Sequence, residues 1–354
     1  MEREEIFAQK TDNDEVLDWD SPGTGTGGAS QPRQGAHALL PTGQGVPGVF
    51  SSPFLFESTP QAPKRILEYF ATQIRNPNTR KAYLNACEKF LSWCEIHSVT
   101  LEDLEPTHVA AYVETMKGSA PTIKQNTAAI RQLLDYLTTK GILEYNPALS
   151  VKTPRHSVTK GKTPVMESDD VRKLLNSLPV DTVVGLRDRA LIGTMVYTFA
   201  RVGAVVKMTV GDFYCTGRRS FLRLKEKGGK DHEVPAHLKL EEYLDCYLEA
   251  AGLSEQKKEP LFQSANGRTD TLTGNPMHRE NVMHMVKRRC RQAGIGEIFG
   301  CHTFRATGIT AYLNAGGTLE KAQQIAAHAS ASTTKLYDRT NDTVSLEEIQ
   351  RIRF

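Results

Sequence analysis

The chain has 354 residues, of which 39% are hydrophobic and 24% charged, with a formal net charge of +3, a composition that suits about two globular domains. No apolar run reaches the roughly 18 residues that a membrane-spanning helix needs, and no Gly-rich Lys-Ser or Lys-Thr loop offers a nucleotide site. The six cysteines form no Cys-x-x-Cys pair, so we expect reduced, intracellular side chains with no secretory leader.

The charge is distributed unevenly along the chain. Residues 1–57 contain nine Asp or Glu against three Lys or Arg, a net of −6, and the rest of the chain carries +9. A basic body favours partners that carry phosphate. Residues 1–57 are also rich in Gly, Pro and Gln with little apolar periodicity, which predicts a disordered acidic arm. This arm is a candidate contact for an accessory protein.

Residues 58–150 have the periodicity of a small helical domain. Apolar side chains recur at helical spacing within 83–94, 109–116 and 123–137, and Gly141 predicts the end of the third helix. The opposite faces carry cations that either contact DNA phosphates or only keep the helices solvated. These cations are Arg80, Lys81, Lys124 and Arg131.

Residues 151–164 have prolines near both ends and no apolar periodicity, which is typical of an extended linker. A basic linker of this kind could cross a DNA backbone. Its cations are Lys152, Arg155, Lys160 and Lys162.

A second domain is expected over residues 165–340, followed by a C-terminal segment over 341–354. Helical patterns in 168–175 and 190–195 come first, and Arg201 lies where the second of them ends. The whole chain is therefore predicted to be mainly α with a small antiparallel β-sheet, in two domains that follow the arm.

The sheet is predicted from a hairpin pattern. Apolar runs at 221–224 and 233–235 flank Lys227-Gly228-Gly229-Lys230, and positive φ is cheap only for glycine. The tip of such a hairpin can place a lysine in a DNA groove. Lys227 and Lys230 are therefore candidate DNA contacts, with Lys225 close by.

The last quarter of the chain contains His302-Thr303-Phe304-Arg305, then His328 and, nine residues later, Tyr337. One helical turn places His302 and Arg305 side by side, as an anion clamp. Ser332-Thr333-Thr334 is expected to start a short helix that carries Tyr337. A tyrosine hydroxyl with its ordinary pKa near ~10 becomes a nucleophile only with help, which a phosphate-binding pocket would supply.

This order of His-x-x-Arg, His and Tyr resembles the tyrosine site-specific recombinases, also called the phage integrase family, which include the Xer recombinases. Residues 79–93 resemble the core-binding domain of that family. The resemblance implies a two-domain architecture, with a helical core-binding domain and a mixed catalytic domain that close around a DNA duplex as a clamp. It also implies that Tyr337 cleaves a DNA strand.

Further roles follow from the resemblance alone. It implies that Arg201 contacts the scissile phosphate and that Lys227 is the general acid for the leaving 5′ oxygen, with Lys225 and Lys230 as competitors. The family often has a Glu three residues after this Arg, where this chain has Ala204, so an acid holding the guanidinium is missing or comes from elsewhere. Ala326-Ala327 replaces the Leu-Gly that commonly precedes the second His.

These residues suit phosphoryl transfer that needs neither cofactor nor metal. In-line attack by the Tyr337 oxygen builds charge on the phosphate, for which Arg201, Arg305 and His328 are candidate donors. His302 could take the phenolic proton or add another donor. The product would be a 3′-phosphotyrosyl bond, which stores the energy of the broken phosphodiester for resealing.

The expected partners are double-stranded DNA recombination sites and further copies of the chain, as a homotetramer on two sites, with no membrane. We expect a cytoplasmic, nucleoid-associated protein. Ser345 and Glu348 form a capping-box pattern, and the helix that they start either folds back on its own domain or docks into the neighbouring protomer. No feature selects among integration, excision, transposition and resolution.

Two alternatives remain at this point. A type IB topoisomerase uses similar chemistry as a monomer to relax supercoils, and a two-site recombination assay separates it from a recombinase. A catalytically inactive DNA-binding protein of the same fold is the other alternative, and the complete set of candidate residues argues against it.

Overall fold

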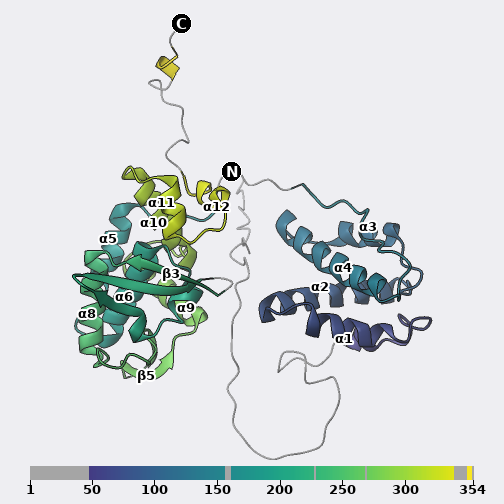
Figure 1. The fold of residues 1–354 in the computed structure, drawn as a ribbon, viewed down its shortest axis with the longest axis horizontal. Coiled ribbons are helices and arrows are strands. Elements are labelled where there is room, and N and C mark those ends of the chain that lie inside the picture. Colours follow the sequence, from purple (N-terminus) through teal and green to yellow (C-terminus); the bar gives the residue numbers. More distant parts are fainter. Residues whose placement is uncertain (1–47, 156–160, 227–228, 268, 339–348, 353–354) are drawn as a thin grey trace, which may run out of the picture. The chain divides into compact units, whose positions relative to one another are not determined.

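The computed structural model describes residues 48–155, 161–226, 229–267, 269–338 and 349–352. The chain divides after Ser157 into two compact units (Figure 1). Helices dominate both, and the strands belong to small antiparallel sheets of the second unit, which confirms the predicted fold class. Within the described ranges no helix combines the length and the apolar character needed to cross a membrane.

In the described part of the first unit, the α-helices are α1 (Ala62–Thr72), α2 (Pro77–Ile96), α3 (Pro106–Thr115) and α4 (Ala120–Thr139). Each has a proline at its first or second position, where the missing N–H costs no hydrogen bond. The apolar stripes predicted on three of these helices bury side chains such as Phe90, Val109 and Ile130 in one core. Helical periodicity therefore identified this unit correctly.

The predicted boundary of the N-terminal arm at residue 57 is wrong, because residues 48–57 are part of the first unit. A 3-10 helix, η2 (Gly48–Ser51), contacts α1 and α2. Phe50, Leu55 and Phe56 are all buried in the core of this unit. Burying three large apolar side chains offsets the cost of ordering this segment. Residues 1–47 of the predicted arm lie outside the described residues.

The second unit is built around a central helix. Its helices are α5 (Ser168–Ser177), α6 (Val183–Thr198), α7 (Val202–Val205), α8 (Leu238–Ala250), α9 (Arg279–Gln292), α10 (Cys301–Asn314), α11 (Leu319–Ile325) and α12 (Ala331–Lys335). Helix α6 is buried on nearly all sides and packs against both α8 and α10. Figure 1 shows α10, α11 and α12 together at one end of this unit.

Strands β1 (Phe213–Thr216), β2 (Arg219–Glu226) and β3 (Lys230–Pro235) form an antiparallel sheet in that order. In the β2–β3 hairpin Glu226 lies opposite Lys230, and Gly229 has a φ of 74°, which explains the glycine there. Strands β4 (Gln263–Asn266) and β5 (Thr271–Pro276) form a second hairpin. The hairpin predicted around Gly228 and Gly229 is therefore present.

Helices α6 and α10 cross at a glycine. A Cβ atom on Gly308 would lie 2.2 Å from the carbonyl oxygen of Val196 and 2.6 Å from the ring of Phe199, so no larger residue fits. This close approach packs the middle of α10 against the C-terminal end of α6, and Arg305 on α10 donates to the carbonyl oxygen of Phe199 just after that end. It therefore places His302 and Arg305 beside the segment that leads to Arg201.

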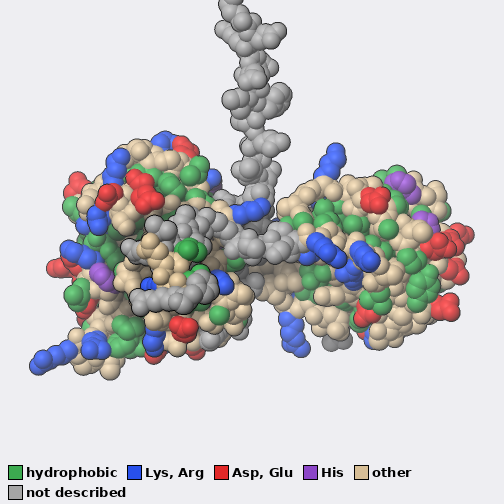
Figure 2. Space-filling model, turned by 90° about the horizontal axis from the view of Figure 1, so that it is seen from above, with side chains coloured by type: hydrophobic (Ala, Val, Ile, Leu, Met, Phe, Trp, Pro, Cys, Tyr) green, Lys and Arg blue, Asp and Glu red, His purple; other side chains and the backbone are tan. Residues whose placement is uncertain are grey.

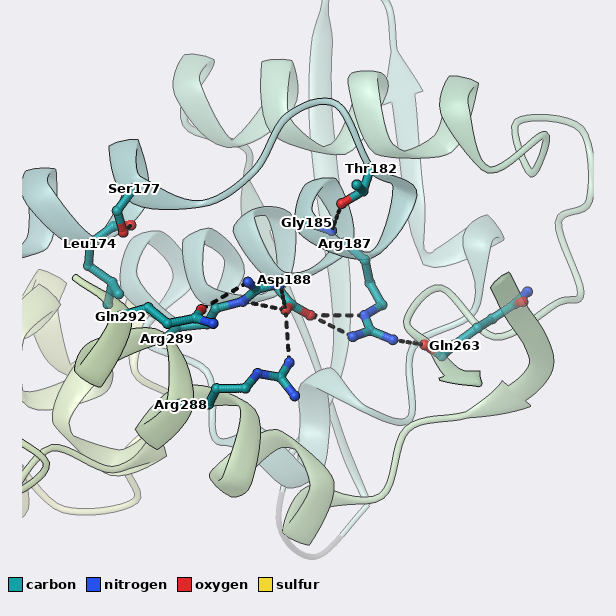
Figure 3. A network of polar contacts seen from close by, with 10 residues as sticks. All are labelled: Leu174, Ser177, Thr182, Gly185, Arg187, Asp188, Gln263, Arg288, Arg289 and Gln292. Atoms are coloured by element: carbon teal, nitrogen blue, oxygen red, sulfur yellow. Dashed lines mark hydrogen bonds and ion pairs between the residues drawn. The ribbon is translucent and has the colours of Figure 1, made fainter. Parts of the chain in front are cut away.

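A buried ion network holds α6 against α9 and β4 (Figure 3). The fully buried carboxylate of Asp188 accepts hydrogen bonds from Arg187, at 2.6 Å from its Nη2, and from Arg289, at 2.9 Å from its Nε. Arg187 also donates to the carbonyl oxygen of Gln263 on β4. Because each buried charge has a partner, the network fixes these elements without leaving an uncompensated ion.

Candidate active site

The predicted nucleophile contacts the first predicted imidazole. The Nε2 atom of His302 lies 2.9 Å from the hydroxyl oxygen of Tyr337. His302 is exposed near the start of α10, whereas Tyr337 is only 7% exposed. Tyr337 lies in the turn after α12, rather than on the predicted helix itself, and its backbone N–H donates to Thr334. The imidazole is therefore in position to exchange a proton with the phenol.

Arg305 is buried and held rigidly close to Tyr337. It is 1% exposed, and its two Nη atoms donate to the carbonyl oxygens of Phe199 and Ala326, the latter at 2.6 Å. Its Nε has no hydrogen-bond partner within the described residues. Burial, followed by the neighbouring charge of Arg201, lowers the pKa of Arg305 to about 10. A fixed, buried cation with a spare donor is well suited to bind an anion.

Two backbone positions near Arg305 have unusual conformations. Phe199, at the end of α6, has a φ of 55°, and Ala327 has a φ of 48°. A residue with a Cβ atom pays about 1–2 kcal/mol in this left-handed region. Both residues adjoin a carbonyl group that accepts a hydrogen bond from Arg305. One is the carbonyl of Phe199 itself, and the other is that of Ala326, which precedes Ala327. The Ala that replaces the family's Gly before His328 therefore retains a glycine-like backbone.

His328 is buried and neutral. Burial, and then the charges of Arg305 and Arg201, lower its pKa to about 3. Its Nδ1 lies 2.8 Å from the hydroxyl of Thr334, which is itself fully buried. Its ring is nearly parallel to that of Tyr337, with centroids 5.9 Å apart. His328 can therefore offer a neutral hydrogen-bond donor beside the phenol.

The environment of Tyr337 acts on its hydroxyl in two directions. Burial raises the pKa of Tyr337, while the charges of Arg305 and Arg201 oppose that rise. The backbone carbonyl of Tyr337 accepts from the buried Thr310 hydroxyl at 3.1 Å, which ties it to α10. The phenol is thus held in place and remains protonated near neutral pH until a base removes its proton.

Arg201 is joined to an acid that the sequence analysis did not identify. Its Nη1 lies 2.5 Å from the Oε2 of Glu226, the last residue of β2. The side chain of Glu226 is 3% exposed and that of Arg201 26%. The acid that holds the Arg201 guanidinium therefore comes from elsewhere, as one of the two expected alternatives had it, and lies on a strand 25 residues after Arg201. The departure at Ala204 from the Glu that the family often has was the signal in the sequence that the acid could come from another element.

Lys227, the predicted general acid, lies outside the described residues. Glu226, which precedes Lys227 in the chain, is described and forms the ion pair with Arg201 at the turn end of β2. The described candidates Arg201, His302, Arg305, His328 and Tyr337 are linked by direct contacts or by the charge effects given above. Five of the six predicted catalytic side chains are therefore brought together.

The predicted DNA-contacting cations differ in their surroundings. Arg80 donates to the carbonyl of Ile74 at 2.8 and 3.0 Å, and Arg131 donates to the carbonyls of Ala148 and Val151. Both arginines therefore hold loops of the first unit, and contact with DNA stays a prediction for them. Figure 2 shows basic and acidic side chains gathered toward opposite ends of the visible face of this unit.

The remaining predicted cations are mostly exposed. Lys81, Lys152, Arg155 and Lys162 are exposed, and Lys124 is half-buried on α4. Lys160 and the side chain of Lys230 lie outside the described residues. In the C-terminal segment only residues 349–352 are described, where Ile349 and Ile352 are 54% and 60% exposed. The capping box of Ser345 and Glu348 lies outside the described residues.

Comparisons with known proteins agree with this architecture. A family model described as the phage integrase family matches residues 164–343, and one described as the phage integrase N-terminal SAM-like domain matches residues 67–141. The first match alone spans more than half of the chain. The protein is therefore an enzyme of the site-specific tyrosine recombinase class. The chain belongs to the phage integrase family.

Within this family the chain is similar to Xer recombinases. It is 27% identical over 269 residues to the tyrosine recombinase XerD of Listeria monocytogenes, covering 73% of this chain and 87% of that protein. It is 29% identical over 267 residues to XerD of Pseudomonas aeruginosa, covering 73% and 86%. The XerC protein of Thermodesulfovibrio yellowstonii is 26% identical over 269 residues, covering 73% and 85%.

Two solved structures share the fold. The XerH site-specific recombinase bound to a palindromic difH substrate, in a post-cleavage complex, has a TM-score of 0.61 and 20% identity, covering 83% of this chain and 84% of that one. A lambda integrase tetramer bound to a Holliday junction has a TM-score of 0.62 and 17% identity, covering 81% and 80%. The arrangement of helices and sheets is therefore that of DNA recombinases.

Proposed function

We propose that this tyrosine recombinase cuts and rejoins specific duplex DNA sites through a covalent bond between Tyr337 and a 3′ phosphate. The observation that carries the proposal is the 2.9 Å contact between the Tyr337 hydroxyl and His302, next to two guanidinium groups. The Tyr337 ring packs in a small apolar cluster, but its hydroxyl lies beside a base and fixed cations. The hydroxyl has a clear chemical purpose if a phosphodiester binds there.

The first step is proton removal and attack. His302 accepts the phenolic proton through Nε2 as the Tyr337 oxygen forms a bond to phosphorus, and the P–O5′ bond breaks. Lys227 donates a proton to the departing 5′ oxygen. The 3′ phosphate stays on Tyr337. In the reverse reaction another 5′ hydroxyl gives its proton to Lys227 and bonds to phosphorus, the bond from phosphorus to the Tyr337 oxygen breaks, and His302 returns a proton to that oxygen.

The cations stabilise the charge that develops on the phosphate. Arg305 cannot swing away, because two backbone carbonyls hold its Nη atoms. Donors fixed before the reaction need no reorganisation in the transition state, and each contributes roughly 2.7–4 kcal/mol in known oxyanion sites. Arg201 adds a second guanidinium, whose planar fork suits paired phosphate oxygens.

His328 contributes without adding charge. Its low pKa keeps the imidazole neutral in the pH range in which cells work. If Nδ1 accepts the Thr334 proton, the ring carries its own proton on Nε2 and can donate it to a phosphate oxygen. The phosphate would then meet two cations, Arg201 and Arg305, and one neutral donor. Because His328 adds no third positive charge, the repulsion between the cations is smaller while no phosphate is bound.

The partners follow from this chemistry and from the relatives. We propose double-stranded recombination sites as the substrate and a homotetramer on two sites as the active assembly, since lambda integrase forms a tetramer on a Holliday junction. Action on DNA also suits a cytoplasmic, nucleoid-associated location. A contact of the N-terminal arm with an accessory protein, and docking of the C-terminal segment into a neighbouring protomer, remain proposals. The biological task among integration, excision, transposition and resolution stays open.

A two-site assay tests the proposal. Binding sites are first selected from a pool of random duplexes with the Tyr337→Phe protein, which lacks only the attacking oxygen. Two duplexes of different length, each with the selected site, are then mixed with the wild-type chain. We expect recombinant products of exchanged length. In parallel, a supercoiled plasmid with the selected site is given to the wild-type chain. Relaxation of this plasmid without strand exchange between the duplexes would favour a topoisomerase, and binding without any covalent complex would favour an inactive DNA-binding protein.

A further inference from the structure

A buried carboxylate lies at the turn end of the β2–β3 hairpin, in contact with the proposed phosphate site. Glu226 ends β2, and its Oε2 accepts from Arg201 Nη1 at 2.5 Å. Only 3% of its side chain is exposed. A buried carboxylate is costly unless it is paired, so the Arg201 guanidinium and Glu226 fix each other's position.

The position of Arg201 needs such a partner. Arg201 lies between α6 and α7 in extended backbone, with no side-chain role in capping the helix, and 26% of its side chain is exposed. A long side chain there would otherwise sample several rotamers. A guanidinium carries five N–H donors, so one bond to Glu226 still leaves donors for a phosphate.

The charges in the site require the same acid. Arg201 and Arg305 are close enough for the charge of Arg201 to lower the pKa of Arg305, whereas Glu226 raises it. Two cations that await one phosphate repel each other while the site is empty. The carboxylate of Glu226, paired with Arg201, reduces that repulsion.

Ala204 cannot supply this interaction. It is a buried apolar residue within α7, one turn from Arg201. Glu233 on the same hairpin serves elsewhere, because its Oε1 accepts from Tyr214 and Arg223. Within the described part of the chain, Glu226 is thus the carboxylate that contacts Arg201.

We propose that Glu226 is the positioning residue of this active site, holding the Arg201 guanidinium in the orientation that binds the scissile phosphate. The inference rests on the proposed function, since it assigns to Glu226 a part in strand cleavage. Glu226 does not touch the reacting atoms. It acts through Arg201, and its effect on the reaction must therefore depend both on Arg201 and on the charge of the phosphate.

The test measures single-turnover formation of the covalent complex with the full chain on a nicked duplex that carries the selected site. Glu226→Gln keeps the size of the side chain and removes its charge. We expect cleavage to slow by roughly 10- to 100-fold, less than for loss of a phosphate donor itself. Glu233→Gln is the matched control, because it removes a carboxylate from the same hairpin without touching Arg201, and its rate should equal that of the wild type.

Two further measurements separate positioning from general damage to the fold. In an Arg201→Ala background, Glu226→Gln should slow cleavage by no more than about twofold, since the two residues act as one unit. On a duplex whose scissile phosphate is a neutral methylphosphonate, the loss caused by Glu226→Gln should shrink, because the charge that Arg201 meets is gone. Glu226→Asp keeps the charge but shortens the reach, and should give an intermediate rate.

The outcomes discriminate clearly. A normal cleavage rate for Glu226→Gln overturns the proposal, as does an equal loss on the phosphodiester and the methylphosphonate. If Glu226→Gln does not fold, Glu226→Asp carries the same two comparisons. Absence of a covalent complex with the wild-type chain would overturn the proposed function together with this inference, whereas failure at Glu226 alone leaves the proposed function intact.

Discussion

The Nε2 atom of His302 lies 2.9 Å from the Tyr337 hydroxyl oxygen, although 35 positions separate the two residues. His302 lies on α10 and Tyr337 in the turn after α12. The hydroxyl of Thr310 on α10 donates to the backbone carbonyl of Tyr337 and so holds these two segments together. Because burial raises the pKa of Tyr337, the phenol needs a base close by. The contact therefore joins the nucleophile to the group that can activate it.

His302→Ala should slow strand cleavage by roughly 10²- to 10⁴-fold, the usual contribution of a positioned base. Without the base, attack depends on the ionised fraction of Tyr337, which grows about tenfold per pH unit below the pKa of the phenol. The rate of the variant should therefore rise more steeply with pH than that of the wild type. Single-turnover rates from pH 6 to 9 check this, and parallel profiles would count against His302 as the base.

Arg305→Ala should slow cleavage by roughly 10²- to 10³-fold, as expected for a lost oxyanion donor. The variant also leaves the carbonyls of Phe199 and Ala326 without their partner, so its melting temperature should fall as well. Arg305→Lys separates the two effects, because it keeps a charge but loses the fork that bridges both carbonyls. A normal rate for the Lys variant would mean that geometry at this position is unimportant.

Ala327→Gly should stabilise the second unit. The φ of 48° at Ala327 is strained for any residue with a Cβ atom, and glycine would relieve that strain. Glycine also increases the conformational entropy of the unfolded chain, but the relief of strain should exceed this cost, for a net stabilisation of about 0.5–1 kcal/mol. The neighbouring Ala326, whose φ of −77° is ordinary, provides the control, since Ala326→Gly should destabilise. Thermal unfolding of both variants gives the comparison. A lower melting temperature for Ala327→Gly would contradict the expectation.

His328 should make the protein sensitive to acid. Its pKa is about 3 in the folded chain and 6.5 when unperturbed, so below pH 6.5 the unfolded chain binds a proton that the folded chain does not. Stability from this residue is complete above pH 6.5 and declines as the pH falls toward 3, by roughly 2 kcal/mol at pH 5. His328→Gln should reduce the loss of melting temperature between pH 7 and pH 5. An unchanged loss would show that other groups cause it.

Local patterns in the sequence predict local structure well. Helical spacing identified α2, α3 and α4, and the glycines at 228 and 229 identified the β2–β3 hairpin. The order of His302, Arg305, His328 and Tyr337 identified the site through resemblance to a family. In each case the signal lies within one element or in the spacing of neighbouring residues.

Contacts between distant elements were not predictable in the same way. Glu226 looks like one more charge in a basic hairpin until β2 is placed beside Arg201. Asp188 and Arg289 lie 101 positions apart and would pass for surface charges, although Asp188 is fully buried. The composition of residues 1–57 concealed Phe50 and Leu55, whose burial depends on helices that follow them. Periodicity carries no information about such pairings.

The central claim, that Tyr337 forms a covalent bond to DNA, has a direct measurement. Wild-type chain and Tyr337→Phe are each mixed with a nicked suicide substrate that carries the selected site, and the products are denatured. The wild type should give a denaturant-resistant complex, in which the peptide containing Tyr337 carries the nucleotide by mass spectrometry. Tyr337→Phe should bind the DNA almost normally and give no such complex. A denaturant-resistant complex with Tyr337→Phe, or a nucleotide on another residue, would contradict the assignment.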